Sequence, residues 1–97
     1  MVCLVDAIPQ PGALVVKSTH GDIAVFRNRE NEVFALLNRC PHKGGPLSKG
    51  MVSGRTVECP LHGWQIGLDD GHAVAPDFGC VRSFPVKIEA GSVFLEA

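Results

Sequence analysis

Residues 38–64 read NRCPHKGGPLSKGMVSGRTVECPLHGW, and two short motifs within this stretch decide how the chain is interpreted. The first is Cys40-Pro41-His42, and the second, after sixteen intervening residues, is Cys59-Pro60-Leu61-His62. Each motif pairs one thiol with one imidazole in a segment rich in glycine and proline, which favours loops. Two such loops that meet at their tips would offer two sulfur and two nitrogen donors to one metal centre.

Two kinds of metal centre use this donor set. In a Rieske [2Fe–2S] cluster two histidines replace two cysteines on one iron, so Cys40 and Cys59 would hold the inner iron and His42 and His62 the outer one. A structural zinc site also takes two cysteines and two histidines, but its motif usually places both cysteines first. The order Cys-x-His followed by Cys-x-x-His favours the cluster and an electron carrier. A zinc-stabilised binding module is the alternative.

The residues beside the four donors are suited to shielding a cluster. Glycines let the backbone approach closely and aim its N–H groups at sulfur, which tunes the reduction potential. We expect the surroundings of the cluster to be formed by Gly44, Gly45, Pro46, Gly63 and Trp64. For Trp64, ordinary packing in the core is the alternative role.

Length and composition narrow the function further. Ninety-seven residues make one small domain, and 45% hydrophobic with 20% charged residues is an ordinary globular composition. A net charge of −1 without runs of like charge argues against binding to nucleic acid or to an anionic membrane. No apolar stretch approaches the roughly 18 residues of a membrane span, and residues 1–8 lack the basic start of a secretory signal. We therefore expect a cytoplasmic protein, with Cys3 and Cys80 as small buried apolar residues.

The sequence predicts an all-β fold. Eleven glycines and seven prolines indicate many turns, no segment has a long helical period, and Ala90-Gly91 predicts a tight hairpin turn. The predicted strands are Ala13–Lys17, Ile23–Arg27, Glu32–Leu37, Thr56–Cys59, Ser83–Glu89 and Ser92–Glu96. We expect a single domain over residues 1–97, an antiparallel β sandwich or barrel. A loop-rich cluster-binding subdomain of about residues 38–70 would be inserted into it.

Over nearly its whole length the chain resembles the Rieske ferredoxin family, and within it the small subunits of assimilatory NAD(P)H-dependent nitrite reductases. The resemblance is carried by Asn38–Ser48, Cys59–Trp64, Gly71–Asp77 and Phe84–Ile88. Gly63 departs from the narrower pattern, because many of those small subunits have Asn there. The resemblance implies a Rieske fold, a [2Fe–2S] cluster, and a large partner subunit with flavin, sirohaem and another iron–sulfur cluster that reduces nitrite to ammonium.

The chain itself offers no machinery for that reaction. It has no G-x-G-x-x-G dinucleotide fingerprint and no further cysteine group for a second cluster, so we expect no catalytic residue in it. It would then be enzymatic only as the electron-carrying subunit of a nitrite reductase complex in nitrate assimilation. The alternative is a freestanding Rieske ferredoxin that supplies electrons to an aromatic-ring dioxygenase.

Overall fold

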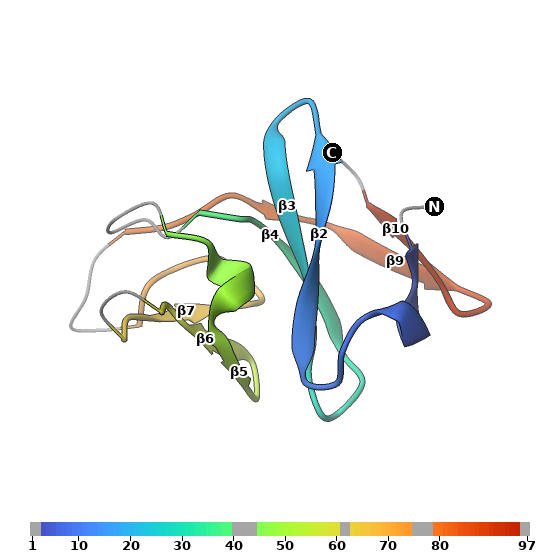
Figure 1. Cartoon of the computed structure of the whole chain (residues 1–97), viewed down its shortest axis with the longest axis horizontal. Helices are drawn as coiled ribbons and strands as arrows, with labels where there is room; N and C mark the ends of the chain where they lie inside the picture. The colour runs from blue at the N-terminus through green and yellow to red at the C-terminus, as the bar shows by residue number, and fades with distance from the viewer. Residues whose placement is uncertain (1–2, 40–44, 61–62, 75–78, 96–97) are drawn as a thin grey trace.

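The computed structural model describes residues 3–39, 45–60, 63–74 and 79–95 of the chain. Within them, short strands follow one another, interrupted by two single turns of 3-10 helix, η1 (Val5–Ala7) and η2 (Leu47–Lys49) (Figure 1). The strands are β1 (Cys3–Leu4), β2 (Gly12–Ser18), β3 (Gly21–Arg27), β4 (Val33–Leu37), β5 (Met51–Ser53), β6 (Thr56–Glu58), β7 (Gln65–Gly67), β8 (Ser83–Phe84), β9 (Val86–Glu89) and β10 (Ser92–Leu95). All the pairings between these strands are antiparallel, which confirms the predicted fold class. No helix in the described part is long and apolar enough to cross a membrane.

The strands form three sheets, with the orders β1-β10-β9, β2-β3-β4-β8 and β5-β6-β7. In Figure 1 the sheet that contains β2, β3 and β4 stands in the middle, the β5-β6-β7 sheet lies to its left, and β9 and β10 lie to its right. The central sheet therefore separates the small β5-β6-β7 sheet, after which the second motif begins, from the C-terminal hairpin.

Strand β3 shows why the central sheet is buried on both faces. Successive strand residues point to opposite faces, and Ile23 and Val25 pack into one core together with residues of β8 and β10. Ala24 and Phe26 pack into the other core with residues of η2 and β6. Both cores thus draw on one strand, which explains why its sequence is a continuous apolar run rather than an alternation of apolar and polar residues.

Three predicted strands need correction. Glu32–Leu37 is β4 but begins at Val33. The predicted strand Ser83–Glu89 is divided at Pro85 into β8 and β9, because proline has no N–H to donate to a ladder. Thr56–Cys59 is β6 but ends at Glu58, and its neighbours β5 and β7 were not predicted, because three residues are too few to display a period. The small sheet β5-β6-β7 falls within residues 38–70, yet the division into a subdomain and one 1–97 domain stays a prediction.

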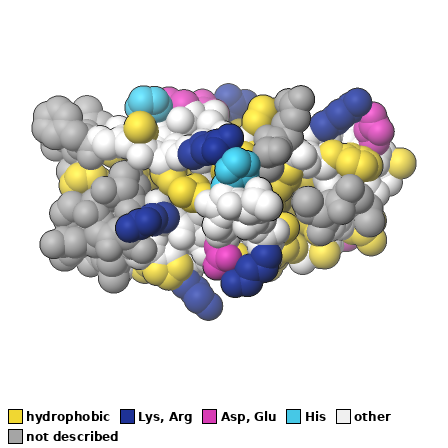
Figure 2. Space-filling model, turned by 90° about the horizontal axis from the view of Figure 1, so that it is seen from above, with side chains coloured by type: hydrophobic (Ala, Val, Ile, Leu, Met, Phe, Trp, Pro, Cys, Tyr) yellow, Lys and Arg dark blue, Asp and Glu magenta, His cyan; other side chains and the backbone are white. Residues whose placement is uncertain are grey.

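Side chains of both signs are interspersed with apolar ones on the face shown in Figure 2, and no large patch of one charge lies on it. This mixture fits the net charge of −1. A protein that binds nucleic acid usually carries a patch or stripe of Lys and Arg side chains, which this face does not show.

Candidate metal centre

The second motif begins at the end of β6 in a tightly closed loop. The Cys59 N–H donates a hydrogen bond to the Trp64 carbonyl at 2.6 Å, and the Gly63 N–H donates one to the Cys59 carbonyl at 3.0 Å. Gly63 has a φ of +71°, a left-handed conformation that glycine adopts without steric cost. The loop that carries residues 60–62 is therefore pinned where it leaves and where it re-enters the β5-β6-β7 sheet.

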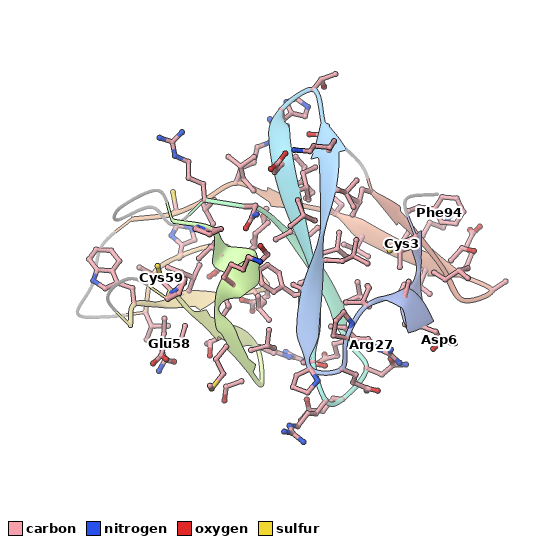
Figure 3. All side chains as sticks on the ribbon, in the orientation of Figure 1. Cys3, Asp6, Arg27, Glu58, Cys59 and Phe94 are labelled. Atoms are coloured by element: carbon pink, nitrogen blue, oxygen red, sulfur yellow. The ribbon has the colours of Figure 1, made fainter. Side chains whose placement is uncertain are left out.

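The Cys59 side chain points into the core rather than into solvent. Cys59 is only 2% exposed and belongs to the core cluster that also contains Leu47 and Val57, against which the half-buried Trp64 packs. Figure 3 shows Cys59 at the left end of the molecule, beside the β6 residue Glu58. A buried sulfur on a short glycine-containing loop fits a metal–thiolate centre that must be kept from water.

The described residues on either side of the first motif are joined by a hydrogen bond. The Ser48 N–H donates a hydrogen bond to Asn38 Oδ1 at 2.8 Å, and the Asn38 N–H donates one to the Asp22 carbonyl at 2.8 Å. Asn38 thereby links Ser48, which lies in η2, to Asp22 in β3 of the central sheet. Leu47 is fully buried in the same core as Cys59, so a residue that follows the first motif packs in one core with the first residue of the second motif.

The predicted ligands and neighbours are thus placed in part. Of the four predicted ligands, Cys59 is described, whereas Cys40, His42 and His62 lie outside the described residues, as does Gly44 among the neighbours. Among the remaining predicted neighbours, Gly45 is buried, Pro46 and Gly63 are exposed and Trp64 is half-buried. The ligand set stays a prediction, and the chemistry of its donors, together with the burial of Cys59, fits a [2Fe–2S] cluster.

A buried asparagine fixes the β5–β6 turn to the central sheet. Asn28 is fully buried; its Nδ2 donates to Glu32 Oε1 at 3.0 Å and to the Gly54 carbonyl at 3.0 Å, and its Oδ1 accepts from the Glu32 N–H at 2.8 Å. Arg55 adds an ion pair with Glu32 at 2.7 Å. This link was not predicted, and its signal in the sequence is a polar residue directly after an apolar strand.

This link also changes two titrations. The hydrogen bond from Arg55, followed by the one from Asn28, lowers the pKa of the Glu32 carboxyl, and the same Glu32–Arg55 hydrogen bond raises the pKa of Arg55. Both side chains are exposed to solvent at their ends, so their ion pair is a modest stabiliser. The ion pair also helps to hold the β5–β6 turn against the end of β3.

Cys3 and Cys80 were both predicted to be buried, but they differ in exposure. Cys3 is half-buried against the core that contains Val5 and Val93, and burial raises the pKa of its thiol. Cys80 is exposed, so its predicted burial is wrong. The reason is its place in an isolated bridge with His72 at the surface, outside any sheet.

Comparison with known proteins settles the family. Residues 1–85 match the model of the Rieske [2Fe–2S] domain. The chain belongs to the Rieske family. It is a Rieske electron-transfer domain, and the cofactor of that domain is a [2Fe–2S] cluster.

Relatives of this Rieske domain include separate ferredoxins. It is 36% identical over 95 residues to the ferredoxin component of the naphthalene 1,2-dioxygenase/salicylate 5-hydroxylase systems of Ralstonia sp., covering 97% of this chain and 89% of that protein. The ferredoxin of Sphingomonas yanoikuyae B1 has 28% identity and a TM-score of 0.85, with 99% of this chain and 95% of that chain covered.

Two other similarities place Rieske domains in larger systems. A protein of Mycobacterium tuberculosis assigned as an NADH-dependent nitrite reductase small subunit has 25% identity and a TM-score of 0.83, over 94% of this chain and 86% of that chain. The chain is also 35% identical over 85 residues to a 4β-methylsterol monooxygenase of Methylococcus capsulatus, but spans only 23% of its length.

Proposed function

We propose that this Rieske domain is the electron-transfer small subunit of an NAD(P)H-dependent nitrite reductase, in which Cys40 and Cys59 hold the inner iron and His42 and His62 the outer iron. One observation carries the ligand assignment. The buried Cys59 belongs to the same core as Leu47, which follows the first motif in the sequence. The segments Gly71–Asp77 and Phe84–Ile88, and the likeness to the mycobacterial small subunit, support the choice of partner.

The cluster supplies one-electron transfer when it is bound, and the residues of the chain hold and shield it. Leu47 and Trp64, which pack in or against the core that contains Cys59, would shield the cluster from water, and the positive φ of Gly63 lets the chain turn directly after the second motif. Because a single-electron carrier cannot complete a multi-electron reduction alone, the chain needs a redox partner that contains the substrate site.

We place this activity in the cytoplasm, where NAD(P)H is supplied and thiols stay reduced. The described part of the chain offers one supporting feature. Cys3 and Cys80 form no disulfide, and an exposed thiol such as that of Cys80 persists most easily in a reducing compartment.

Analysis of iron and acid-labile sulfide, with an EPR spectrum of the dithionite-reduced full chain, tests the ligand assignment. Two irons, two sulfides and a Rieske-type signal are expected for the wild type, and loss of the signal is expected for His42→Ala and for His62→Ala. His20→Ala is the matched control, because His20 is exposed on the β2–β3 turn. Stoichiometric zinc without an EPR signal would instead identify the zinc-stabilised module.

The second candidate is a ferredoxin for an aromatic-ring dioxygenase, which the 36% identity to the Ralstonia ferredoxin component favours. Two assays separate the candidates. A nitrite reductase subunit should raise NAD(P)H-dependent nitrite reduction by a sirohaem large subunit and bind it stably. A dioxygenase ferredoxin should instead reduce a dioxygenase terminal component and leave nitrite reduction unchanged.

A further inference from the structure

The outer edge of β9 has backbone groups that no strand of the described part pairs with. The Val5 N–H donates to the Gly91 carbonyl, so alternate residues of β10, including Val93, turn their polar groups toward β1. Ser92 and Phe94 then turn theirs toward β9, opposite Glu89 and Lys87. By the alternation of an antiparallel ladder, the N–H and C=O groups of the other two β9 residues, Val86 and Ile88, point outward.

A second ladder ends at the same place. β4 pairs with β8 at Ala35↔Phe84 and Leu36↔Ser83, and the next pair would join Phe34 to Pro85. Proline has no N–H for this ladder, and the chain leaves β4 at Pro85 to join β10 instead. The Leu37 N–H donates to the Arg82 carbonyl. Alternate residues of β4, and therefore Val33, thus face the side from which the chain has departed.

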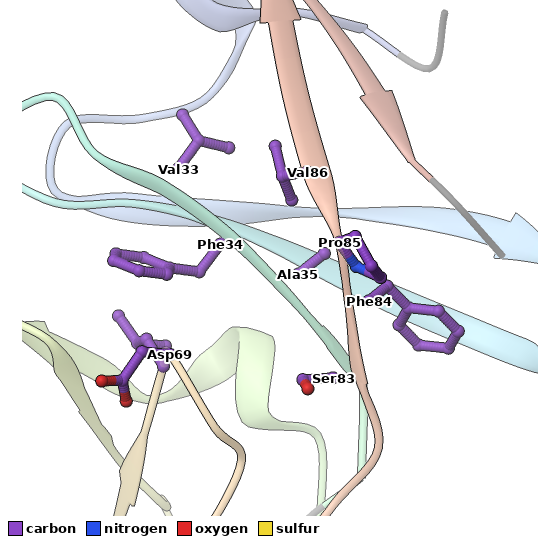
Figure 4. A pocket seen from close by; sticks show the side chains of 9 residues that line it. Val33, Phe34, Ala35, Asp69, Ser83, Phe84, Pro85 and Val86 are labelled. Atoms are coloured by element: carbon purple, nitrogen blue, oxygen red, sulfur yellow. The ribbon is translucent and has the colours of Figure 1, made fainter.

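A cavity of about 460 Å³ lies where the two strands part, and we call it the Pro85 notch. Most of the side chains that line it are apolar, among them Val33, Phe34, Phe84, Pro85 and Val86, but polar groups, with Asp69 and Ser83 at one end, contribute nearly half of the lining surface. Figure 4 shows Val33 and Val86 on neighbouring segments above it, with Asp69 and Ser83 below. A second cavity, of about 340 Å³, adjoins Val86 and contains Phe94 and Leu95 in its lining.

We propose that the Pro85 notch and the outer edge of β9 bind an extended segment of the redox partner's large subunit, by addition of a strand to β9. The proposal rests on the proposed function for the identity of the partner. Outward N–H and C=O groups pair with an extended backbone, and a neighbouring apolar pocket accepts one of its side chains. Ile88, which is 44% exposed, adds apolar surface along the same edge.

The residues that line the notch favour an extended segment of the partner over a second copy of this chain as the occupant. The lining continues from Val86 past Pro85 to Ser83 and Asp69. A second copy could offer its own β9, but the chain doubles back directly after Glu89, at Ala90 and Gly91, where both φ angles are positive. Such a hairpin would turn away before it reached the pocket. A longer strand with an apolar residue opposite Pro85 and a basic or polar residue near Asp69 fits instead.

The notch also leaves the predicted cluster end accessible. Val33 and Asn38 are five residues apart on one continuous extended segment, so roughly 17 Å of strand separates the notch from the first ligand loop. A partner held at the notch can therefore keep the domain bound while the ligand loops face its cofactor.

Hydrogen exchange at single-residue resolution tests the proposal on the cluster-containing full chain, alone and bound to the sirohaem large subunit. In the free chain the Val86 and Ile88 amides should exchange fast, and the Lys87 and Glu89 amides, which are bonded to β10, slowly. In the complex the exchange of Val86 and Ile88 should slow by about ten-fold or more, while Lys87 and Glu89 change little.

Two variants add an affinity measurement. Ile88→Pro removes an outward N–H without touching the β9–β10 ladder, and Ser83→Trp fills the notch from an exposed position. Each should weaken binding of the large subunit by about ten-fold. Ile88→Thr and Ser83→Thr, which keep the N–H and the open pocket, are the matched controls. Unchanged cluster absorbance shows that each variant is folded, and if Ile88→Pro loses it, Ser83→Trp decides.

The outcomes separate this proposal from the proposed function. If the complex forms but the Val86 and Ile88 amides exchange as fast as before, the notch proposal is overturned and the nitrite reductase assignment stands. If the large subunit does not bind the wild-type chain, the assignment is wrong and the proposal is overturned with it. Concentration-dependent protection of Val86 and Ile88 in the free chain would also overturn it, in favour of a second copy at this edge.

Discussion

Replacing Asn28 with alanine should lower the free energy of unfolding by about 2.5–4 kcal/mol. The side chain is 0% exposed and takes part in three hydrogen bonds of 2.8–3.0 Å. Two of them are between neutral groups, worth about 0.5–1.5 kcal/mol each, and the one to the Glu32 carboxylate is worth about 1.5–3 kcal/mol. Since Glu32 keeps Arg55 and the exposed Gly54 carbonyl can bind water, the lower part of that sum applies.

Chemical and thermal unfolding under anaerobic conditions, followed by far-UV circular dichroism, measures this loss. For a domain of this size, about 2.5–4 kcal/mol corresponds to a fall in melting temperature of roughly 10–30 °C. Visible absorbance of the cluster, recorded alongside, shows whether the small sheet detaches before the rest unfolds. A loss below about 0.5 kcal/mol would refute the reasoning, because it would mean that water replaces the asparagine without cost.

The isosteric variant Asn28→Asp gives the same argument a pH dependence. Its carboxylate would face Glu32 Oε1 and the Gly54 carbonyl, the two acceptors that Nδ2 now contacts at 3.0 Å. Burial and the neighbouring negative charge favour the protonated acid, so the folded-state pKa of the new carboxyl lies above its unfolded value of about 3.9. The variant should therefore be more stable than Asn28→Ala at low pH, where the protonated acid can still donate one hydrogen bond and accept one, and should lose stability relative to it as pH rises toward 7. A parallel pair of pH profiles would contradict this.

Two further predictions concern residues near the same sheets. Gly71→Ala should destabilise the fold by about 2 kcal/mol more than Gly91→Ala in denaturant titrations. The φ angles are alike, +74° and +79°, but an added Cβ would overlap the Val81 carbonyl at Gly71 and meet open space at Gly91; equal losses would refute it. Glu32→Gln should flatten the acid limb of stability against pH. The lowered folded-state pKa of Glu32 contributes stability above its ordinary value of 4.5, and this is lost as pH falls through the folded value; unfolding titrations between pH 6 and about 3 measure it.

The long strands could be predicted because their signals are local. Gly12–Ser18 and Gly21–Arg27 enclose a polar turn, and Ala90-Gly91 marks the C-terminal hairpin at the position where both residues have positive φ. β5 and β7 could not be predicted, because their three residues form strands only by pairing with β6. The division at Pro85 was in principle readable, since a proline within a predicted central strand argues against continuity there.

The donor residues of the candidate site can be predicted from the sequence, whereas the geometry of the site cannot. The donors of the two motifs are set by spacings of two and three residues, so residue type and position alone predict a [2Fe–2S] ligand set. What holds the loops in place acts over longer distances along the chain: Asn38 accepts from the N–H ten residues ahead, and Asn28 donates to a carbonyl 26 residues ahead. An asparagine after a strand predicts only a turn, whereas here each one joins separate parts of the fold. The positions that build the centre's frame are therefore those at which a polar side chain is buried or half-buried, and only the packed structure distinguishes them from ordinary turn residues.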